Sequence, residues 1–158
     1  GCDPGGTSFD ICVLPKGVIE YLREPIVGRF EICNPMRDIS TIGAGGGTKA
    51  RVEKAARLLI VGPESAGADP GPVCYDRGGT VPTVTDADVV MNRIDANYFL
   101  AGRMKLNRDK ALRAIEEQIA APLGLDVYDG IWQRRTDSLR WFHRRAEFQG
   151  DYHPAVRR

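Results

Sequence analysis

The chain has 158 residues, which is enough for one ordinary domain with a hydrophobic core but too few for two full domains. Apolar residues make up 42% and charged residues 27%, the balance of a soluble globular protein rather than a disordered one. The formal net charge of +1 excludes a strong overall attraction to nucleic acid or to an anionic membrane.

The front of the chain alternates short β-like runs with glycine loops, and most of the 18 glycines and 10 prolines precede residue 82. We predict strands at residues 9–14, 18–23 and 26–33, and a fourth short apolar run at residues 58–61. The Pro-Lys-Gly break at residues 15–17 is predicted to join the first two strands as a hairpin.

The back of the chain is poor in glycine and proline and has helical periodicity. Thr85 to Asp88 has the spacing of a capping box, with aspartate in place of glutamate, and predicts a helix that runs to about Arg93. A stronger helix is predicted at residues 108–122, because its apolar residues recur at helical spacing. Asn107 can cap this helix.

A third helix is predicted from Tyr128 to about Phe148, ahead of the chain end. Its aromatic residues, among them Trp132 and Trp141, stand among arginines at helical spacing rather than in a stacking platform. This pattern favours an amphipathic helix at a subunit interface, so we expect no nucleic-acid partner.

The four cysteines are Cys2, Cys12, Cys33 and Cys74, with no C-x-x-C pair and only two histidines, so a structural zinc site is not expected. Cys12 and Cys33 lie in apolar runs, which favours reduced, buried thiols. The sequence contains no signal peptide and no apolar run of membrane-spanning length. We therefore expect a cytoplasmic protein without a membrane partner.

Two standard phosphate motifs are excluded by single positions. Residues 43–49, GAGGGTK, resemble a Walker A loop, but the residue before Lys49 is Thr48 where that motif has glycine. The same Thr48 stands where G-x-G-x-x-G has its last glycine. The chain is therefore neither a P-loop protein nor a Rossmann protein.

Residues 3–10, DPGGTSFD, offer another way of holding phosphate. The two successive glycines permit positive φ and a close approach of the backbone to an anion. The hydroxyls beside them can donate to phosphate oxygens, and Asp3 and Asp10 can hold Mg²⁺ through its water shell. From these residues alone, a plain tight turn with solvated polar side chains explains the pattern equally well.

Two further loops have open interpretations. Gly45, Gly46 and Gly47 indicate a close approach of the backbone to another group. That group is either a bound nucleotide or substrate, or the backbone of a neighbouring strand. The loop at residues 62–75 could line a substrate channel or simply cross between elements, and the second interpretation is favoured. Capping explains Asp86 and Asp88 without a function.

Several motifs in register resemble the hydantoinase A/oxoprolinase family. They are D-x-G-G-T-S-x-D, P-x-x-D-I-x-T-I-G-A-G-G-G-T, V-G-P-E-S-A-G-A-D-P-G-P-V-C-Y, R-G-G-T-x-P-T-V-T-D-A-D and F-L-A-G-R-M-x-L, and together they cover residues 3–126. The sequence around residues 27–30 and 92–95 is most similar to the acetone and acetophenone carboxylase branch.

The resemblance implies an α/β chain that is part of an actin-like (ribonuclease H-like) ATPase lobe, with hairpins and glycine loops first and helices after. Residues 1–102 would form the glycine-loop part and residues 103–158 a helical part of the same domain. The resemblance implies ATP and Mg²⁺ (or Mn²⁺) as cofactors. Gly5, Gly6, Thr7 and Ser8 would hold phosphates, together with the triple-glycine loop, and Asp3 and Asp10 would be catalytic residues that orient the metal.

The family resemblance also implies a chemistry, in which phosphorylation activates a carbonyl or amide oxygen. Its substrate would be a small ketone that is carboxylated or a cyclic amide that is opened. The expected partner is a hydantoinase B-like subunit in a hetero-oligomer.

The chain starts two residues before a motif and has no initiator Met, so we expect a fragment of a longer protein that is inactive by itself. The alternative is a non-catalytic remnant or assembly subunit that keeps the fold and binds a partner subunit.

Overall fold

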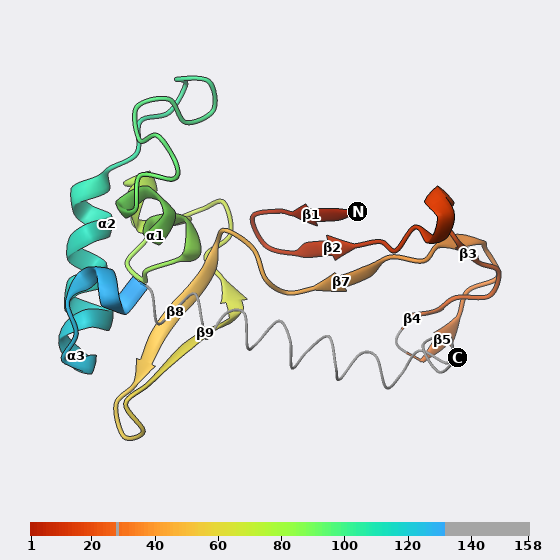
Figure 1. Ribbon diagram of the computed structural model, residues 1–158, viewed down its shortest axis with the longest axis horizontal. Helices are drawn as coiled ribbons and strands as arrows, with labels where there is room; N and C mark the ends of the chain where they lie inside the picture. Colours follow the sequence, from red (N-terminus) through yellow and green to blue (C-terminus); the bar gives the residue numbers. More distant parts are fainter. Residues whose placement is uncertain (28, 132–158) are drawn as a thin grey trace.

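The computed structural model describes residues 1–27 and 29–131. It is a mixed fold of strands and helices with two regions, as Figure 1 shows. Residues 1–42 form an extended arm of short strands, and residues 43–131 form a compact body that contains the longer β hairpin and the helices.

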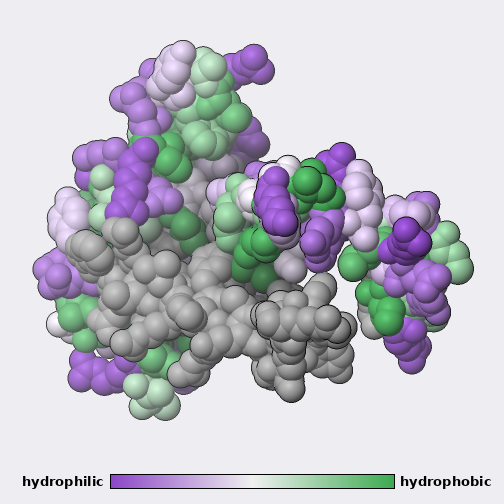
Figure 2. Space-filling model, turned by 45° about the vertical axis from the view of Figure 1, so that its right-hand side comes forward, coloured by the Kyte–Doolittle hydropathy of each residue, from purple (hydrophilic) through white to green (hydrophobic). Residues whose placement is uncertain are grey.

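The arm is built from short antiparallel pairings. Its largest sheet has the order β1-β2-β7, with strands β1 (Cys2–Pro4), β2 (Phe9–Ile11) and β7 (Ser40–Ile42). Two smaller pairs follow toward its far end, β3 (Tyr21–Leu22) with β6 (Met36–Arg37) and β4 (Ile26–Val27) with β5 (Phe30–Glu31). In Figure 2, hydrophobic and hydrophilic surfaces lie side by side along the arm.

The strand predictions for the arm are confirmed in position but too long. The predicted third strand is split into the hairpin β4–β5. The prediction that residues 15–17 join the first two strands as a hairpin is wrong, because β2 pairs with β1 and β7 whereas β3 pairs with β6. Those residues form a 3₁₀ turn, η1 (Pro15–Gly17). Strand pairing between distant segments decided the outcome, and local turn residues do not encode it.

The body begins with the hairpin of β8 (Thr48–Glu53) and β9 (Leu58–Ser65), which contains the predicted apolar run. Ala50 and Leu59 point into the core from this hairpin, and both are less than 5% exposed. A short 3₁₀ turn, η2 (Val73–Tyr75), leads toward the helices.

The first helix is α1 (Val84–Val90). Its capping box is formed by Thr83 and Asp86, so the prediction of a box at residues 85–88 is two residues too late. Both frames have a Thr three residues before an Asp, but only in the first are both side chains buried, since Asp88 is half-buried.

The predicted helix at residues 108–122 is confirmed, with Asn107 as its cap. It runs through α2 (Arg108–Ile115), a π-helical segment η3 (Glu116–Ala120) and α3 (Ala121–Leu123), and ends at Gly124 with φ of 70°. Residues 127–131 are helical, and the rest of the predicted third helix, with its tryptophans and arginines, lies outside the described residues.

The core lies where β8–β9, α1 and the α2–α3 helix meet. Each large aliphatic side chain buried there contributes about 1.5–3 kcal/mol. The central residues, from strands and helices alike, are Leu59, Val89, Val90, Ile115, Ile119 and Leu123.

Cys74 belongs to the same core, whereas Cys33 is exposed and Cys12 is half-buried. The prediction of a buried thiol at position 33 is therefore wrong, because Cys33 lies just after β5, a two-residue strand of the arm whose own residues are exposed. Within the described residues, no helix is long and apolar enough to cross a membrane.

Candidate functional site

The candidate site is centred on the hairpin tip, residues 5–8, which joins β1 to β2. The tip is closed by a hydrogen bond from the Gly5 N–H to the Ser8 carbonyl oxygen, 2.8 Å long. Neither Gly5 nor Gly6 adopts positive φ, so the expected left-handed backbone is absent at both positions. A different feature of the tip has to explain its glycines.

The triple-glycine loop, residues 45–47, packs directly against the hairpin tip. The Gly46 N–H donates to the Gly5 carbonyl oxygen at 3.0 Å, and the Gly47 N–H donates to the Gly6 carbonyl oxygen at 2.6 Å. A Cβ at Gly45 would lie 2.5 Å from the Gly5 oxygen, and a Cβ at Gly47 would lie 2.9 Å from the Gly6 oxygen. Close backbone packing therefore accounts for glycine at positions 45 and 47.

These two hydrogen bonds orient the peptide units of the tip. In a trans peptide the C=O and N–H groups point in opposite directions. Because the Gly5 and Gly6 carbonyls face the triple-glycine loop, the N–H groups of Gly6 and Thr7 point away from it. No atom of the described residues lies within 4 Å of the position that a Cβ would take on Gly6. The tip thus presents two neighbouring N–H donors beside open space.

The triple-glycine loop is itself anchored in the body. The Gly46 carbonyl oxygen accepts from the Thr85 N–H in the first turn of α1 at 2.8 Å, and the Gly47 carbonyl oxygen accepts from the Ala66 N–H at 2.8 Å. A Cβ at Gly46 would lie 2.7 Å from the Thr85 hydroxyl. Through this loop, the exposed tip is fixed to the buried helix.

Hydroxyl groups adjoin the tip from two segments. The Thr7 Oγ1 lies 3.4 Å from the Oγ of Ser65, the last residue of β9. The Ser65 Oγ also accepts from the Gly67 N–H at 3.1 Å. Thr7 is exposed, while Ser8 and Ser65 are half-buried.

Asp3 and Asp10 lie directly opposite each other in the β1–β2 ladder, and Thr41 of β7 lies opposite Asp10. Residues directly opposite in an antiparallel pair share one face, with Cβ atoms about 4.5–5.5 Å apart. The Thr41 hydroxyl donates to Asp10 Oδ1 at 2.6 Å. Among the described residues, no three His, Cys, Asp or Glu side chains converge on a metal position. A metal here would need water or ligand oxygens besides the two carboxylates.

Asp86 is fully buried and holds the loop before α1 in place. Its carboxylate accepts from the backbone N–H groups of Thr83 (2.8 Å), Val73 (3.2 Å) and Cys74 (2.7 Å), and from the Thr83 hydroxyl (2.8 Å). Burial, followed by the Asp86 charge, raises the pKa of the Cys74 thiol far above its ordinary range. The interpretation of Asp86 as a capping residue is confirmed, and the loop at residues 73–74 is a buried crossing.

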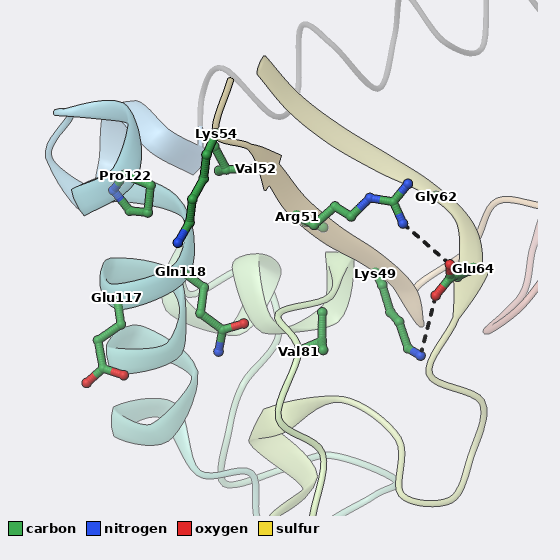
Figure 3. Close-up of a pocket in the computed structure, with 11 residues that line it drawn as sticks. Lys49, Arg51, Val52, Lys54, Gly62, Glu64, Val81, Glu117, Gln118 and Pro122 are labelled. Atoms are coloured by element: carbon green, nitrogen blue, oxygen red, sulfur yellow. Dashed lines mark hydrogen bonds and ion pairs between the residues drawn. The ribbon is translucent and has the colours of Figure 1, made fainter. Parts of the chain in front are cut away.

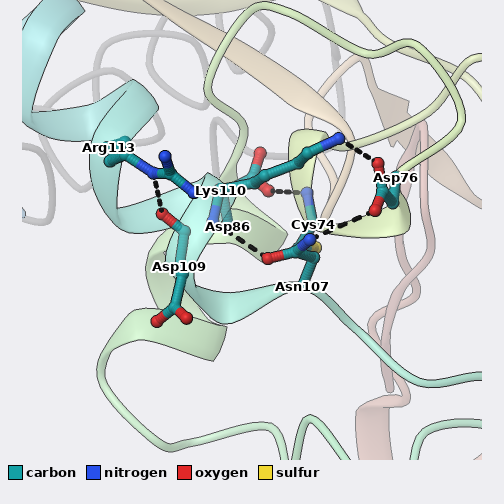
Figure 4. Close-up of polar contacts among 7 residues, drawn as sticks. All are labelled: Cys74, Asp76, Asp86, Asn107, Asp109, Lys110 and Arg113. Atoms are coloured by element: carbon teal, nitrogen blue, oxygen red, sulfur yellow. Dashed lines mark hydrogen bonds and ion pairs between the residues drawn. The ribbon is translucent and has the colours of Figure 1, made fainter.

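A second polar network joins this loop to α2 (Figure 4). The Asn107 amide donates to Asp76 Oδ2 at 3.1 Å, and Lys110 forms an ion pair with the same carboxylate. Hydrogen bonds from Lys110 and then from Asn107 lower the pKa of the Asp76 carboxyl group. The Asn107 N–H also donates to the Cys74 carbonyl oxygen, so the network braces the helix start.

A cleft of about 410 Å³ lies between the β8–β9 hairpin and the α2–α3 helix (Figure 3). At one end, Lys49 and Arg51 share the carboxylate of Glu64, at 3.9 and 3.4 Å. Lys54 and Gln118 line the opposite end. Both cations at the first end therefore pair with one exposed carboxylate. These ion pairs link the two strands of the hairpin but contribute little to stability.

The structure brings the predicted site residues of the tip and of the triple-glycine loop into contact, with the predicted carboxylates on the two strands behind the tip. Sequence reasoning missed Thr41 and did not assign Ser65 to the tip. Both come from strands whose approach depends on long-range pairing, so no local pattern marks them.

The hydantoinase/oxoprolinase family model matches residues 1–133. The acetophenone carboxylase gamma subunit of Aromatoleum aromaticum is 47% identical over 128 residues, covering 80% of this chain and 18% of that protein.

Two solved structures share the fold. A nucleotide-free structure of acetone carboxylase has a TM-score of 0.74 at 34% identity, covering 82% of this chain and 18% of that one. A crystal structure of ATP-dependent caprolactamase from Pseudomonas jessenii has a TM-score of 0.70 at 43% identity, covering 82% of this chain and 19% of that one. The chain thus spans about a fifth of the length of these relatives.

Proposed function

The chain belongs to the hydantoinase/oxoprolinase family, and on that premise we propose that it is the phosphate-holding part of an ATP-dependent subunit. In this proposal the parent enzyme activates a carbonyl or amide oxygen by phosphorylation. The reaction is either ketone carboxylation or the opening of a cyclic amide, since an acetophenone carboxylase subunit and an ATP-dependent caprolactamase are both among the relatives.

The observation that carries the proposal is the orientation of the hairpin tip. Neighbouring N–H groups directed at open space form a concave anion site, and carbonyl oxygens in the same place would repel phosphate. At this tip both carbonyls are hydrogen-bonded to Gly46 and Gly47, so the N–H groups of Gly6 and Thr7 are left on the accessible side. The missing Cβ of Gly6 lets an anion reach them.

The carboxylates behind the tip fit a metal ion. Two aspartates near a polyphosphate would repel it unless a cation lay between them. Mg²⁺ keeps several waters and is bound through one or two carboxylates together with substrate phosphates, which suits the pair Asp3 and Asp10. The Thr41 hydroxyl fixes one Asp10 oxygen and leaves the other to face the metal. ATP and the metal together would supply a transferable phosphoryl group with neutralised charge.

The tip holds a ligand from one side, because Thr7 is exposed. We therefore propose an actin-like arrangement in which a second lobe covers the nucleotide. The similar acetophenone carboxylase protein is named as a gamma subunit, which supports a hetero-oligomer. We propose a hydantoinase B-like subunit as the partner. Large exposed apolar side chains along the arm also favour contact with another protein surface, notably Val13, Val18, Ile26 and Phe30.

Calorimetric titration of the intact protein with ATP tests the proposal, in the presence and absence of Mg²⁺. Binding should require Mg²⁺, and replacing Asp3 and Asp10 by Asn should weaken that requirement. Absence of binding at millimolar ATP with Mg²⁺, even when the partner subunits are present, would favour the alternative of a non-catalytic assembly subunit.

A further inference from the structure

The end of β9 delivers a hydroxyl group to the hairpin tip from outside the tip sequence. Ser65 is 58 residues from Thr7 in the chain, yet their hydroxyl oxygens are 3.4 Å apart. The Ser65 oxygen also lies where a Cβ on Gly47 would come within 2.9 Å of it. Glycine at position 47 therefore leaves room both for the tip carbonyl and for this hydroxyl.

The protons at this contact can be assigned by counting donors. A serine hydroxyl has one proton to donate and can accept at its oxygen. The Ser65 oxygen accepts from the Gly67 N–H, which leaves the Ser65 proton available for Thr7. When Thr7 donates its only proton to an anion, its oxygen has to act as the acceptor toward Ser65. The hydrogen bonds then run in one direction, with the Gly67 N–H donating to Ser65, Ser65 donating to Thr7, and Thr7 donating to the anion.

We propose that Ser65 is a positioning residue of the phosphate site and acts through the Thr7 hydroxyl. This inference rests on the proposed function. Hydrogen bonds in a chain polarise one another, so Ser65 strengthens Thr7 as a donor and holds its rotamer. The Thr7 hydroxyl then joins the N–H groups of Gly6 and Thr7 as a third donor on one side of the tip. Three donors suit phosphate oxygens.

A simpler role for Ser65 makes a different prediction. If its hydroxyl only closes the turn to Gly67, then its removal affects local stability in the same way whether or not Thr7 carries a hydroxyl. If Ser65 acts through Thr7, its contribution to ATP affinity disappears once the Thr7 hydroxyl is gone. A double-mutant cycle separates the two, because contacting groups that act together give non-additive effects.

The test is calorimetric titration of ATP with Mg²⁺ into the intact protein and into Thr7→Ala, Ser65→Ala and the double variant. Thr7→Ala should weaken ATP binding by about tenfold or more, and Ser65→Ala by about three- to tenfold, as expected for loss of one hydrogen bond to a charged group and one between neutral groups. The double variant should bind like Thr7→Ala. Ser65→Cys, which keeps the side-chain shape with a weaker donor, should reproduce the loss if Ser65→Ala does not fold.

Ser40→Ala is the matched control, since Ser40 is an exposed serine in the same sheet, and its ATP affinity should not change. If Thr7→Ala weakens binding while Ser65→Ala and Ser65→Cys do not, the inference is wrong and the proposed function stands. If the losses of ATP affinity add in the double variant, the inference that Ser65 acts through the Thr7 hydroxyl is also wrong. If the unaltered protein binds no ATP, the proposed function itself fails and this inference fails with it.

Discussion

Gly45→Ala is the substitution that most directly probes how the hairpin tip is held. The new Cβ would stand 2.5 Å from the Gly5 carbonyl oxygen and 2.7 Å from the Gly6 carbonyl carbon, and both are backbone atoms that cannot rotate away. The separation must grow to at least 3.4 Å to reach ordinary van der Waals contact. The tip and the triple-glycine loop therefore have to move apart.

The size of the effect follows from the bonds that join the two segments. Moving the tip away by that amount breaks the hydrogen bonds of 3.0 and 2.6 Å from Gly46 and Gly47. Two such bonds are worth about 1–3 kcal/mol. Because the same bonds orient the tip N–H groups, we expect the affinity for ATP with Mg²⁺ to fall by about tenfold or more, since every 1.4 kcal/mol is about tenfold in Kd.

Gly43→Ala is the matched control in the same segment. No atom of the described residues lies within 4 Å of its Cβ position, and its φ is not positive. Such a change is expected to be neutral or to stabilise the protein by up to about 1 kcal/mol. ATP titration and urea unfolding of the intact protein give both readouts. Equal affinity and equal stability in the two variants would refute the reasoning.

Three further predictions concern other residues. Asp10→Ala should lower kcat more than it raises the KM for the organic substrate, because it removes a proposed metal ligand; unchanged kcat would exclude that role. Asp86→Ala should cost about 3–5 kcal/mol in urea unfolding, since it leaves buried N–H groups without an acceptor, whereas Asp88→Ala, at a half-buried residue with a surface ion pair, should cost under about 1 kcal/mol. The raised pKa of Cys74 predicts a contribution to stability that is complete below the ordinary thiol value of 9.0 and is lost as the pH rises above it; Cys74→Ala should unfold with a flatter dependence on pH between 8 and 10, and parallel curves would contradict this.

Local patterns predicted the helices better than the strands. The helix at residues 108–122 was predictable because its cap, periodicity and terminal glycine all lie within the segment. The strands of the arm are two or three residues long, and their partners lie elsewhere in the chain. The run at residues 9–14 therefore predicted a strand but could not predict its partners. Exposure of Cys33 has the same origin, since an apolar run does not reveal whether a core lies beneath it.

The candidate site was predictable in its residue types but not in its geometry. DPGGTSFD indicated an anion grip with carboxylates, and the ladder places both aspartates opposite each other. The positive φ expected at Gly5 and Gly6 was wrong. Gly45 and Gly47 are glycines because another backbone lies against them, and that contact joins segments 40 residues apart, which no spacing rule encodes. The role of Ser65 depends on the same long-range contact.

The central claim is that the hairpin tip holds phosphate, and Gly6→Val tests it most directly. A Cβ at Gly6 has no atom of the described residues within 4 Å apart from its own chain neighbours, and its φ is not positive, so the variant should fold with an unchanged Tm. The branched side chain would occupy the open space in front of the Gly6 and Thr7 N–H groups. We predict that calorimetric titration of the folded variant shows binding of ATP with Mg²⁺ weakened at least about a hundredfold, as for loss of two hydrogen bonds to a charged group. Normal ATP affinity in a folded Gly6→Val protein would contradict the account.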